Sequence, residues 1–448
     1  MPDVSPAPRC RSERTWKSTA NYRCGVLIIR ASAADIGDLQ RGSPTKGEIL
    51  MSIERPHWAF RTLVTWITSS GLRFCILMWL GQRLLIQGLG SLLVAVFGVP
   101  TRSRGGVLTT FFHWDSGFFA CIAERGYFGP ACDSGATFQR LAFFPAYPML
   151  SRSVAWVVGR GTATASNITA GMWTVSAVAS LFAVVALYYL ARLGGGPAMA
   201  QRSVAFLLFW PYSLFLVASY SESLYLAAAI TAWFFCQRQR YVSCAFAGIV
   251  ATATRANGIF LVPALLILYV TSARRDGRQL RVRELVLVAS SSLGVLGYWG
   301  WLAYRTGVPL AWSNAQSDGW NRHTQWPWWT LMQQMIHVLR DPRWDWRVQS
   351  VLELLFAVGV CLALLMLLKR REWAALTLVG LTAVSLMTSN TYLSLGRNTL
   401  AMFPLYLLLG QVSTEGRRPH LRFGVMLAIS ATLMIFNTMQ FALGRWAD

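Results

Sequence analysis

The sequence predicts an all-α protein that crosses a membrane many times, and three observations lead to this prediction. Of the 448 residues, 54% are hydrophobic and only 13% are charged, whereas soluble proteins average about 25% charged residues. The 20 Trp, 24 Phe and 14 Tyr form an aromatic load suited to the two interfaces of a bilayer. Apolar runs long enough to cross about 30 Å of hydrocarbon recur along the chain. Such a composition excludes a coiled coil, a disordered hub and a small disulfide-rich domain.

Residues 1–58 differ from the rest because they are polar and rich in arginine. They lack the charged start, apolar stretch and small-residue cleavage site of a signal peptide. Either they form a disordered cytoplasmic tail, or translation begins at Met51, which lies eight residues before the first apolar segment. We favour the start at Met51 and expect the membrane domain over residues 59–448.

Eleven apolar segments are candidate membrane spans. They lie near 63–82, 168–190, 203–219, 223–236, 242–256, 258–270, 284–304, 350–368, 373–389, 398–412 and 422–440. Residues 242–270 could instead form one tilted or broken helix. Segments 84–98 and 141–159 are also apolar, and we expect both to be interfacial or re-entrant.

The basic residues set the orientation of these spans. Lys and Arg come in short clusters between apolar runs, as in Lys369-Arg370-Arg371, which is typical of cytoplasmic loops. With the N-terminus in the cytoplasm, the inner loops are 191–202, 237–241, 271–283, 369–372 and 413–421. The net charge of +22 therefore does not indicate nucleic-acid binding, because no continuous basic face or recognition motif accompanies it.

Two long outer loops, 99–167 and 305–349, are unusually aromatic. The first contains FFHWD at 111–115 and AFFPAYP at 142–148, and the second contains seven tryptophans. Since tryptophan settles at the headgroup level, we expect both loops to lie on the bilayer. Such a surface suits a lipid-linked substrate, although plain membrane anchoring would also explain many of these aromatics.

The eight cysteines are scattered and form no C-x₂-C pair typical of zinc or redox sites. Cys121 and Cys132 could pair if both lie outside the membrane. Most of the others are expected to be isolated buried thiols.

Asp115 is the first candidate for chemistry. A carboxylate beside Trp114 at a membrane surface should be partly desolvated, which makes it a better proton acceptor. The alternative is a helix N-cap, because Asp before a Ser-Gly-Phe-Phe run caps well. His113 is the one histidine with a plausible chemical neighbour, although it could equally be an interfacial histidine without a role.

Further polar residues interrupt the apolar spans. Glu222 lies at a span boundary, Arg255 and Asn257 break another apolar stretch, and Arg397 lies at the outer end of a late span. Such residues are functional candidates by default, and the predicted topology brings Asp115, Glu222, Arg255 and Arg397 to the outer side. A carboxylate can deprotonate a hydroxyl while guanidinium groups hold a phosphate. Alternatively, Glu222 and one arginine form only an ion pair between helices.

Several common sites are missing from the sequence. It contains no Asp-x-Asp pair, Walker motif, Gly-x-Gly-x-x-Gly or His-Glu-x-x-His. A soluble nucleotide-sugar or ATP therefore has no recognisable binding motif. We expect no cofactor and no metal site; the outer loops hold few carboxylates, and assistance by a divalent ion stays open.

At these residues the sequence resembles the PIG-V family, which includes the second mannosyltransferase of GPI-anchor synthesis (GPI mannosyltransferase 2) and bacterial relatives. The similar segments are WD at 114–115, IAERGY at 122–127, AFFPAYP at 142–148, YSES at 220–223, RANG at 255–258 and GVPLA at 307–311, with AQ at 315–316 and GW at 319–320. They occur in order over about residues 60–410. Each motif is weak alone, but together they are specific.

The resemblance implies a GT-C-type membrane glycosyltransferase that transfers mannose from a polyprenyl-phosphate donor with inversion. Asp115 matches the acidic residue of the first outer loop and would be the general base. Trp114, Tyr127 and Gln316 lie in matching motifs and, with His113 and Asn257, are expected to contact substrate. By our own inference, Arg255 and Arg397 would face the departing lipid phosphate, while Glu222 could support the base or bind acceptor hydroxyls.

Two departures from the family pattern leave the acceptor in question. The family often shows Arg-Tyr late in the chain, where this sequence has Arg397-Asn398, and GYFGP at 126–130 has no acidic residue close behind. Similarity to the bacterial branch favours a bacterial plasma membrane over the endoplasmic reticulum. The expected acceptor is then an outward-facing lipid or glycan, and the partners are the sugar donor, this acceptor and membrane lipids. The alternative function is a sugar-lipid transporter or flippase without catalysis.

Overall fold

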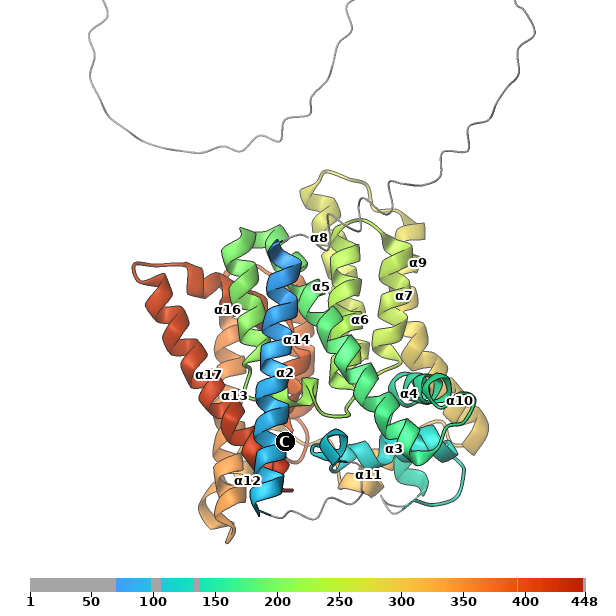
Figure 1. The fold of residues 1–448 in the computed structure, drawn as a ribbon. Helices are drawn as coiled ribbons and strands as arrows, with labels where there is room; N and C mark the ends of the chain where they lie inside the picture. Colours follow the sequence, from blue (N-terminus) through green and yellow to red (C-terminus); the bar gives the residue numbers. More distant parts are fainter. Residues whose placement is uncertain (1–69, 98–105, 133–136, 393, 446–448) are drawn as a thin grey trace, which may run out of the picture. The chain divides into compact units, whose positions relative to one another are not determined.

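The protein is described by a computed structural model that covers residues 70–97, 106–132, 137–392 and 394–445. These residues form α-helices and short 3₁₀ segments, and no strand occurs within those ranges (Figure 1). The predicted all-α class is therefore confirmed. The predictions for residues 1–58, including a start at Met51, lie outside the described residues.

Six helical segments are long and apolar enough to cross a membrane. They are α2 (Ser70–Phe97), α5 (Ala165–Leu208), Ala256–Arg275 with α8 (Leu261–Arg275), Val282–Thr306 with α9 (Val282–Ala289) and α10 (Leu293–Thr306), α13 (Trp344–Lys369) and α17 (Pro419–Ala442). Two shorter apolar helices are α7 (Tyr241–Thr252) and α14 (Trp373–Met387). The structure thus supports a membrane protein, but the predicted count of eleven spans is not confirmed.

Helix α5 contains an internal break that separates two predicted spans, 168–190 and 203–219. Gly195 and Gly196 leave the helical conformation, and Gly196 has a φ of 77°, in the left-handed region that glycine adopts without a steric penalty. Pro197 follows, and the residue before a proline disfavours the α conformation. The two predicted segments therefore lie on either side of one glycine break.

At the N-terminal end of the described chain, one helix replaces the two separate segments that were predicted. The predicted span 63–82 and the predicted interfacial segment 84–98 belong largely to one continuous helix, α2. No proline or helix-ending turn interrupts the run, so its apolar segments join. The other predicted interfacial segment, 141–159, contains α4 (Ala146–Val158), whose 13 residues reach roughly 20 Å and are too short to span.

The two predicted outer loops fold largely as short helices. The first contains α3 (Asp115–Arg125) and α4, and the second contains α11 (Ala311–Trp320) and α12 (Pro327–Arg340). These helices lie at one end of the bundle, whereas the α8–α9 connection lies at the other end (Figure 1). Cys121 and Cys132 form a disulfide with a Cα–Cα distance of 6.1 Å, as the sequence allowed.

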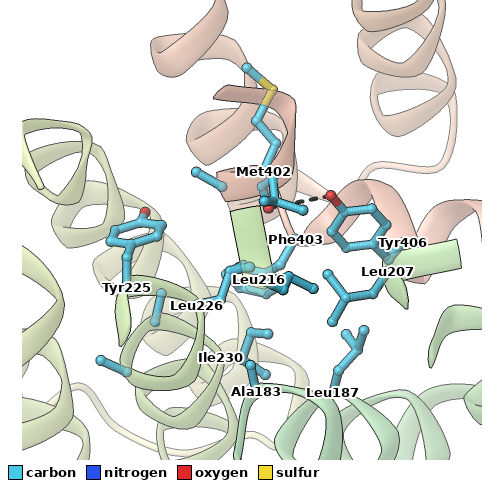
Figure 2. Close-up of a cluster of buried hydrophobic side chains, with 14 of the residues drawn as sticks. Ala183, Leu187, Leu207, Leu216, Tyr225, Leu226, Ile230, Met402, Phe403 and Tyr406 are labelled. Atoms are coloured by element: carbon cyan, nitrogen blue, oxygen red, sulfur yellow. Dashed lines mark hydrogen bonds between the residues drawn. The ribbon is translucent and has the colours of Figure 1, made fainter. Parts of the chain in front are cut away.

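A buried apolar core fixes the segment that precedes α16 (Pro404–Thr414). Figure 2 shows Leu187 of α5 and Ile230 of α6 (Glu222–Gln237) packed with Phe403 and Tyr406. The Tyr406 hydroxyl donates to the carbonyl oxygens of Thr399 and Leu400, both at 3.3 Å. This core therefore anchors the short helix α15 (Leu395–Asn398), which carries Arg397.

Candidate active site

Five of the nine predicted site residues line one cavity of about 390 Å³. They are Asp115, Arg255, Asn257, Gln316 and Arg397. The cavity lies where α3, α11 and α15 meet the connection between α7 and α8. Segments distant in sequence thus bring together the polar residues that the topology placed on one side.

Asp115 is the first residue of α3, and its carboxylate faces Arg397. Arg397 Nη1 donates to Asp115 Oδ2 at 2.8 Å, and the Asp115 side chain keeps 23% of its surface exposed. The N-cap position belongs to Trp114, which makes no side-chain cap. The alternative interpretation of Asp115 as a helix N-cap is therefore wrong. Its carboxylate is instead a partly exposed member of an ion-pair network.

Trp114 has an unusual backbone conformation directly before this carboxylate. Its φ of 52° and ψ of −114° lie outside the regions that L-residues favour. Such conformations cost of order 1–3 kcal/mol and cluster at functional sites. The strain therefore marks the start of α3 as a position that the surrounding structure holds in place.

Glu222 lies deeper than Asp115 and joins two arginines. Its side chain is 2% exposed; its Oε1 accepts from Nε of Arg397 at 2.6 Å and lies 2.5 Å from Nη1 of Arg255. The predicted ion pair between helices is therefore present, and it involves both arginines. Asp115, Arg397, Glu222 and Arg255 form a chain of alternating charges with no net charge.

Two aromatic rings pack against the guanidinium plane of Arg397, in addition to the hydrogen bonds that its N–H groups donate. It lies 4.5 Å from the ring centre of Phe215 and 4.6 Å from that of Tyr220, within the range of cation–π contacts. The Tyr220 hydroxyl in turn donates to the carbonyl oxygen of His113 at 2.8 Å. The loop before Asp115 and the plane of Arg397 are therefore positioned by the same tyrosine.

Asn398 connects the two other polar residues of the cavity. Its Oδ1 accepts from Arg255 Nη2 at 3.2 Å and from Asn257 Nδ2 at 2.9 Å. Its own Nδ2 donates to the carbonyl oxygen of Ser394 at 2.7 Å. Asn398 was not among the predicted site residues, although Arg397-Asn398 departs from the Arg-Tyr of the family pattern.

The structure does not bring His113, Trp114 or Tyr127 to the cavity lining. The His113 ring packs edge-on against Phe441 at 5.4 Å, and burial lowers the pKa of this imidazole, which favours its neutral form. The Trp114 side chain is exposed. Tyr127 is buried and donates to the carbonyl oxygen of Phe143 at 2.7 Å.

Glu222 does not line the cavity either, but it contacts two arginines that do.

Another part of the cavity lining comes from α11 and the residues after it. Trp312, Trp320, Arg322 and His323 line it together with Gln316. Trp312 Nε1 donates to the carbonyl oxygen of Ala142 at 3.2 Å. The aromatic content of the second outer loop predicted a substrate-facing surface but did not single out these residues. No group of three potential metal-ligating side chains occurs within the described ranges.

Residues 95–291 match the family model described as Mannosyltransferase (PIG-V), and no curated protein matches the chain. Among solved structures, ArnT from Cupriavidus metallidurans bound to undecaprenyl phosphate is similar at 14% identity and a TM-score of 0.50, covering 80% of this chain and 63% of that chain. An apo oligosaccharyltransferase from Archaeoglobus fulgidus is similar at 11% identity and a TM-score of 0.43, covering 82% of this chain and 56% of that chain.

The chain thus spans less than two thirds of the length of these two structures. The family match includes Asp115, Glu222 and Arg255, whereas Arg397 lies beyond it. It supports an enzyme rather than the alternative of a transporter without catalysis. The predicted resemblance is therefore confirmed: residues 95–291 match the PIG-V mannosyltransferase family, and the fold of the chain is similar to that of ArnT.

Proposed function

We propose that this protein transfers mannose from a polyprenyl-phosphate mannose donor to a lipid or glycan acceptor on the outer face of a bacterial plasma membrane. The observation that carries the proposal is the cavity in which a partly exposed carboxylate, Asp115, faces the guanidinium of Arg397 at 2.8 Å. The undecaprenyl phosphate bound to ArnT supports a lipid-phosphate carrier as the donor.

The proposed reaction is a single displacement that inverts the anomeric carbon. An acceptor hydroxyl oxygen attacks this carbon while the bond from the carbon to the donor phosphate oxygen breaks. Asp115 takes the hydroxyl proton, and the polyprenyl phosphate leaves with the bonding electron pair. A positioned base of this kind contributes roughly 10²–10⁴-fold to a rate.

Asp115 must be released from Arg397 before it can act as a base, because Arg397 Nη1 occupies the Oδ2 atom that would accept the proton. We infer that the donor phosphate provides this release. Glu222 binds Nε and Nη2 of Arg397, both at 2.6 Å, and leaves Nη1 facing Asp115. A phosphate oxygen at Nη1 would compete with the carboxylate, so that the base becomes free only when donor is bound.

Arg255 and Asn257 are the proposed second half of the phosphate site. Both line the cavity, and Asn398 orients both through one oxygen atom. Arginine suits this role because its guanidinium presents several donors in one plane to a phosphate. The charge that develops on the departing oxygen would thus be stabilised by groups already fixed in place.

The acceptor is proposed to enter along the aromatic wall of α11. Trp312 and Trp320 offer flat apolar surfaces there, and Gln316 adds an amide that can bind a hydroxyl. We infer that the acceptor hydroxyl approaches from this wall while the phosphate binds at Arg255, Asn257 and Arg397.

The test is release of radiolabelled mannose from polyprenyl-phosphate mannose by the purified protein in detergent, with crude envelope lipids as acceptor. Asp115→Asn is expected to slow release roughly 10²–10⁴-fold. Asp318→Asn is the matched control, because this exposed α11 carboxylate does not line the cavity. Near-normal turnover of Asp115→Asn would exclude the base role. Release only from another polyprenyl-phosphate sugar would contradict mannose as the donor sugar.

A further inference from the structure

A second hollow lies at the end of the bundle away from α3 and α11. It encloses about 450 Å³ between the first residues of α7 and those of α9, and Arg240, Arg281 and Arg283 line it with Ser243 and Glu284. The α8–α9 connection lies at this end (Figure 1). The hollow is thus far from the candidate active site and shares none of its lining residues.

The positive charge in this hollow is largely unneutralised. Within the described parts of the chain, neither Arg240 nor Arg283 forms an ion pair or a side-chain hydrogen bond. Arg281 reaches Glu284 only at 3.8 Å, and the same carboxylate already accepts from the Tyr269 hydroxyl at 3.0 Å. Three guanidinium groups therefore face one carboxylate.

Two helix starts add hydrogen-bond donors to these charges. Arg240 and Arg281 occupy the N-cap positions of α7 and α9, and neither makes a side-chain cap. The first N–H groups of a helix have no partner within it, and the helix dipole favours an anion there. The two helix starts therefore add to the positive potential of a hollow that is lined by guanidinium donors, and such a site favours a phosphate.

The same two helices carry exposed apolar side chains in the turns next to the hollow. Val242 and Phe246 of α7, and Val282 and Val286 of α9, are all more than half exposed. Each pair is four residues apart, so its members lie on the same side of their helix. Exposed apolar pairs next to a cationic hollow match a ligand that has an anionic head and hydrocarbon chains.

We propose that this hollow binds the phosphodiester headgroup of an anionic phospholipid, with its acyl chains along α7 and α9. The loop arginines place this end of the bundle in the cytoplasm, where a membrane surface supplies anionic lipids. A free phosphate shares the headgroup chemistry but would make no use of the apolar pairs. The proposal is independent of the transfer reaction.

The test is a titration of the full-length protein in detergent with phosphatidylglycerol, followed by native mass spectrometry and by the thermal unfolding midpoint. Phosphatidylcholine and inorganic phosphate are titrated in parallel. Phosphatidylglycerol is expected to bind and to raise the midpoint. Arg240→Gln/Arg283→Gln should bind it roughly thirtyfold more weakly, because two arginines near the headgroup are lost.

Arg274→Gln/Arg417→Gln is the matched control, since both side chains are exposed in inner loops and neither lines the hollow. It should bind like the wild type. A second variant, Ser243→Glu, places a carboxylate in the hollow and should also weaken binding.

Equal binding of phosphatidylcholine, or equal losses in the control and the double variant, would overturn the proposal. A similar response to inorganic phosphate would replace the lipid with a free anion. Mannose release by Arg240→Gln/Arg283→Gln should stay at the wild-type level, which separates this test from that of the transfer reaction.

Discussion

Asp115 and Glu222 share the guanidinium of Arg397 but differ in their surroundings. Glu222 is 2% exposed and lies behind the cavity, whereas Asp115 is 23% exposed and lines it. A buried carboxylate between two guanidiniums compensates part of their charge, and removing one partner of a buried pair typically costs 3–5 kcal/mol. An accessible carboxylate is instead able to meet a substrate. Neutralising Glu222 should therefore lower stability, whereas neutralising Asp115 should mainly lower the rate of mannose release.

Glu222→Gln is expected to lower the free energy of unfolding by about 3–5 kcal/mol, because Arg397 then loses its buried counter-charge. Asp115→Asn, the matched variant, should lower stability by less than Glu222→Gln does, because Glu222 still pairs with Arg397, while it reduces mannose release. Denaturant unfolding in detergent and label release, measured on the same preparations, check both expectations. Equal stabilities for the two variants would contradict the division into a structural and a reactive carboxylate.

Helix α15 is the element that brings Arg397 to the site, and its position depends on a close approach. A Cβ atom on Gly396 would lie 2.5 Å from the Tyr212 ring, which no side chain tolerates without movement. The Gly396 N–H also donates to Glu353 Oε2 at 2.7 Å. Because Tyr212 is fully buried, the backbone of α15 must move if a side chain is added.

Gly396→Ala is therefore expected to reduce mannose release roughly hundredfold, since displacements of about 1 Å have such effects on catalysis. Its stability should fall by roughly 1–3 kcal/mol, as for other overpacked cores. Gly359→Ala is the matched control, because a Cβ atom at this position of α13 meets nothing within 4 Å. Wild-type turnover in Gly396→Ala would show that α15 does not need this close approach.

The disulfide between Cys121 and Cys132 ties the end of α3 to the following loop. It closes a sequence separation of 11 residues, and closing a loop of this order stabilises a fold by about 3 kcal/mol. Cys121→Ser/Cys132→Ser should therefore lower the unfolding midpoint, and added reductant should lower that of the wild type. Cys361→Ser, which removes an exposed free thiol, should leave the midpoint unchanged; an equal decrease would contradict a stabilising disulfide.

The sequence predicted the long apolar helices better than it predicted the short helices and the contacts between distant side chains. Apolar runs identify α13 and α14 well, because each run ends at charged residues in the connection 369–372. The short helices α3 and α11 were expected as loops, because brief polar and aromatic stretches carry no long apolar run. An ion pair between Glu222 and one arginine was predicted as an alternative, but not that Arg397 joins Glu222 to Asp115, which lies 282 residues away in the sequence. Such pairings depend on how helices pack, which local sequence does not specify.

At the scale of the whole molecule, two independent observations give the same orientation. The arginine-rich connection between α8 and α9 lies at one end of the bundle, and α3, with its disulfide, lies at the other (Figure 1). Cationic loops stay in the cytoplasm, while disulfides persist in oxidising compartments. The end that carries Asp115 should therefore face outward, where a lipid-linked sugar and an envelope acceptor can meet.

Single cysteines at exposed positions test this orientation in intact cells that express the protein. Asp318→Cys in α11 should react with a membrane-impermeant maleimide, because it lies at the end that carries the candidate active site. Gln279→Cys, in the α8–α9 connection, should react only after the cells are permeabilised. Cys10→Ser/Cys24→Ser/Cys361→Ser serves as the background, since it removes the exposed thiol of Cys361 and the two cysteines that precede the described residues. The reverse labelling pattern would place the cavity in the cytoplasm, where a donor on the outer face could not reach Asp115.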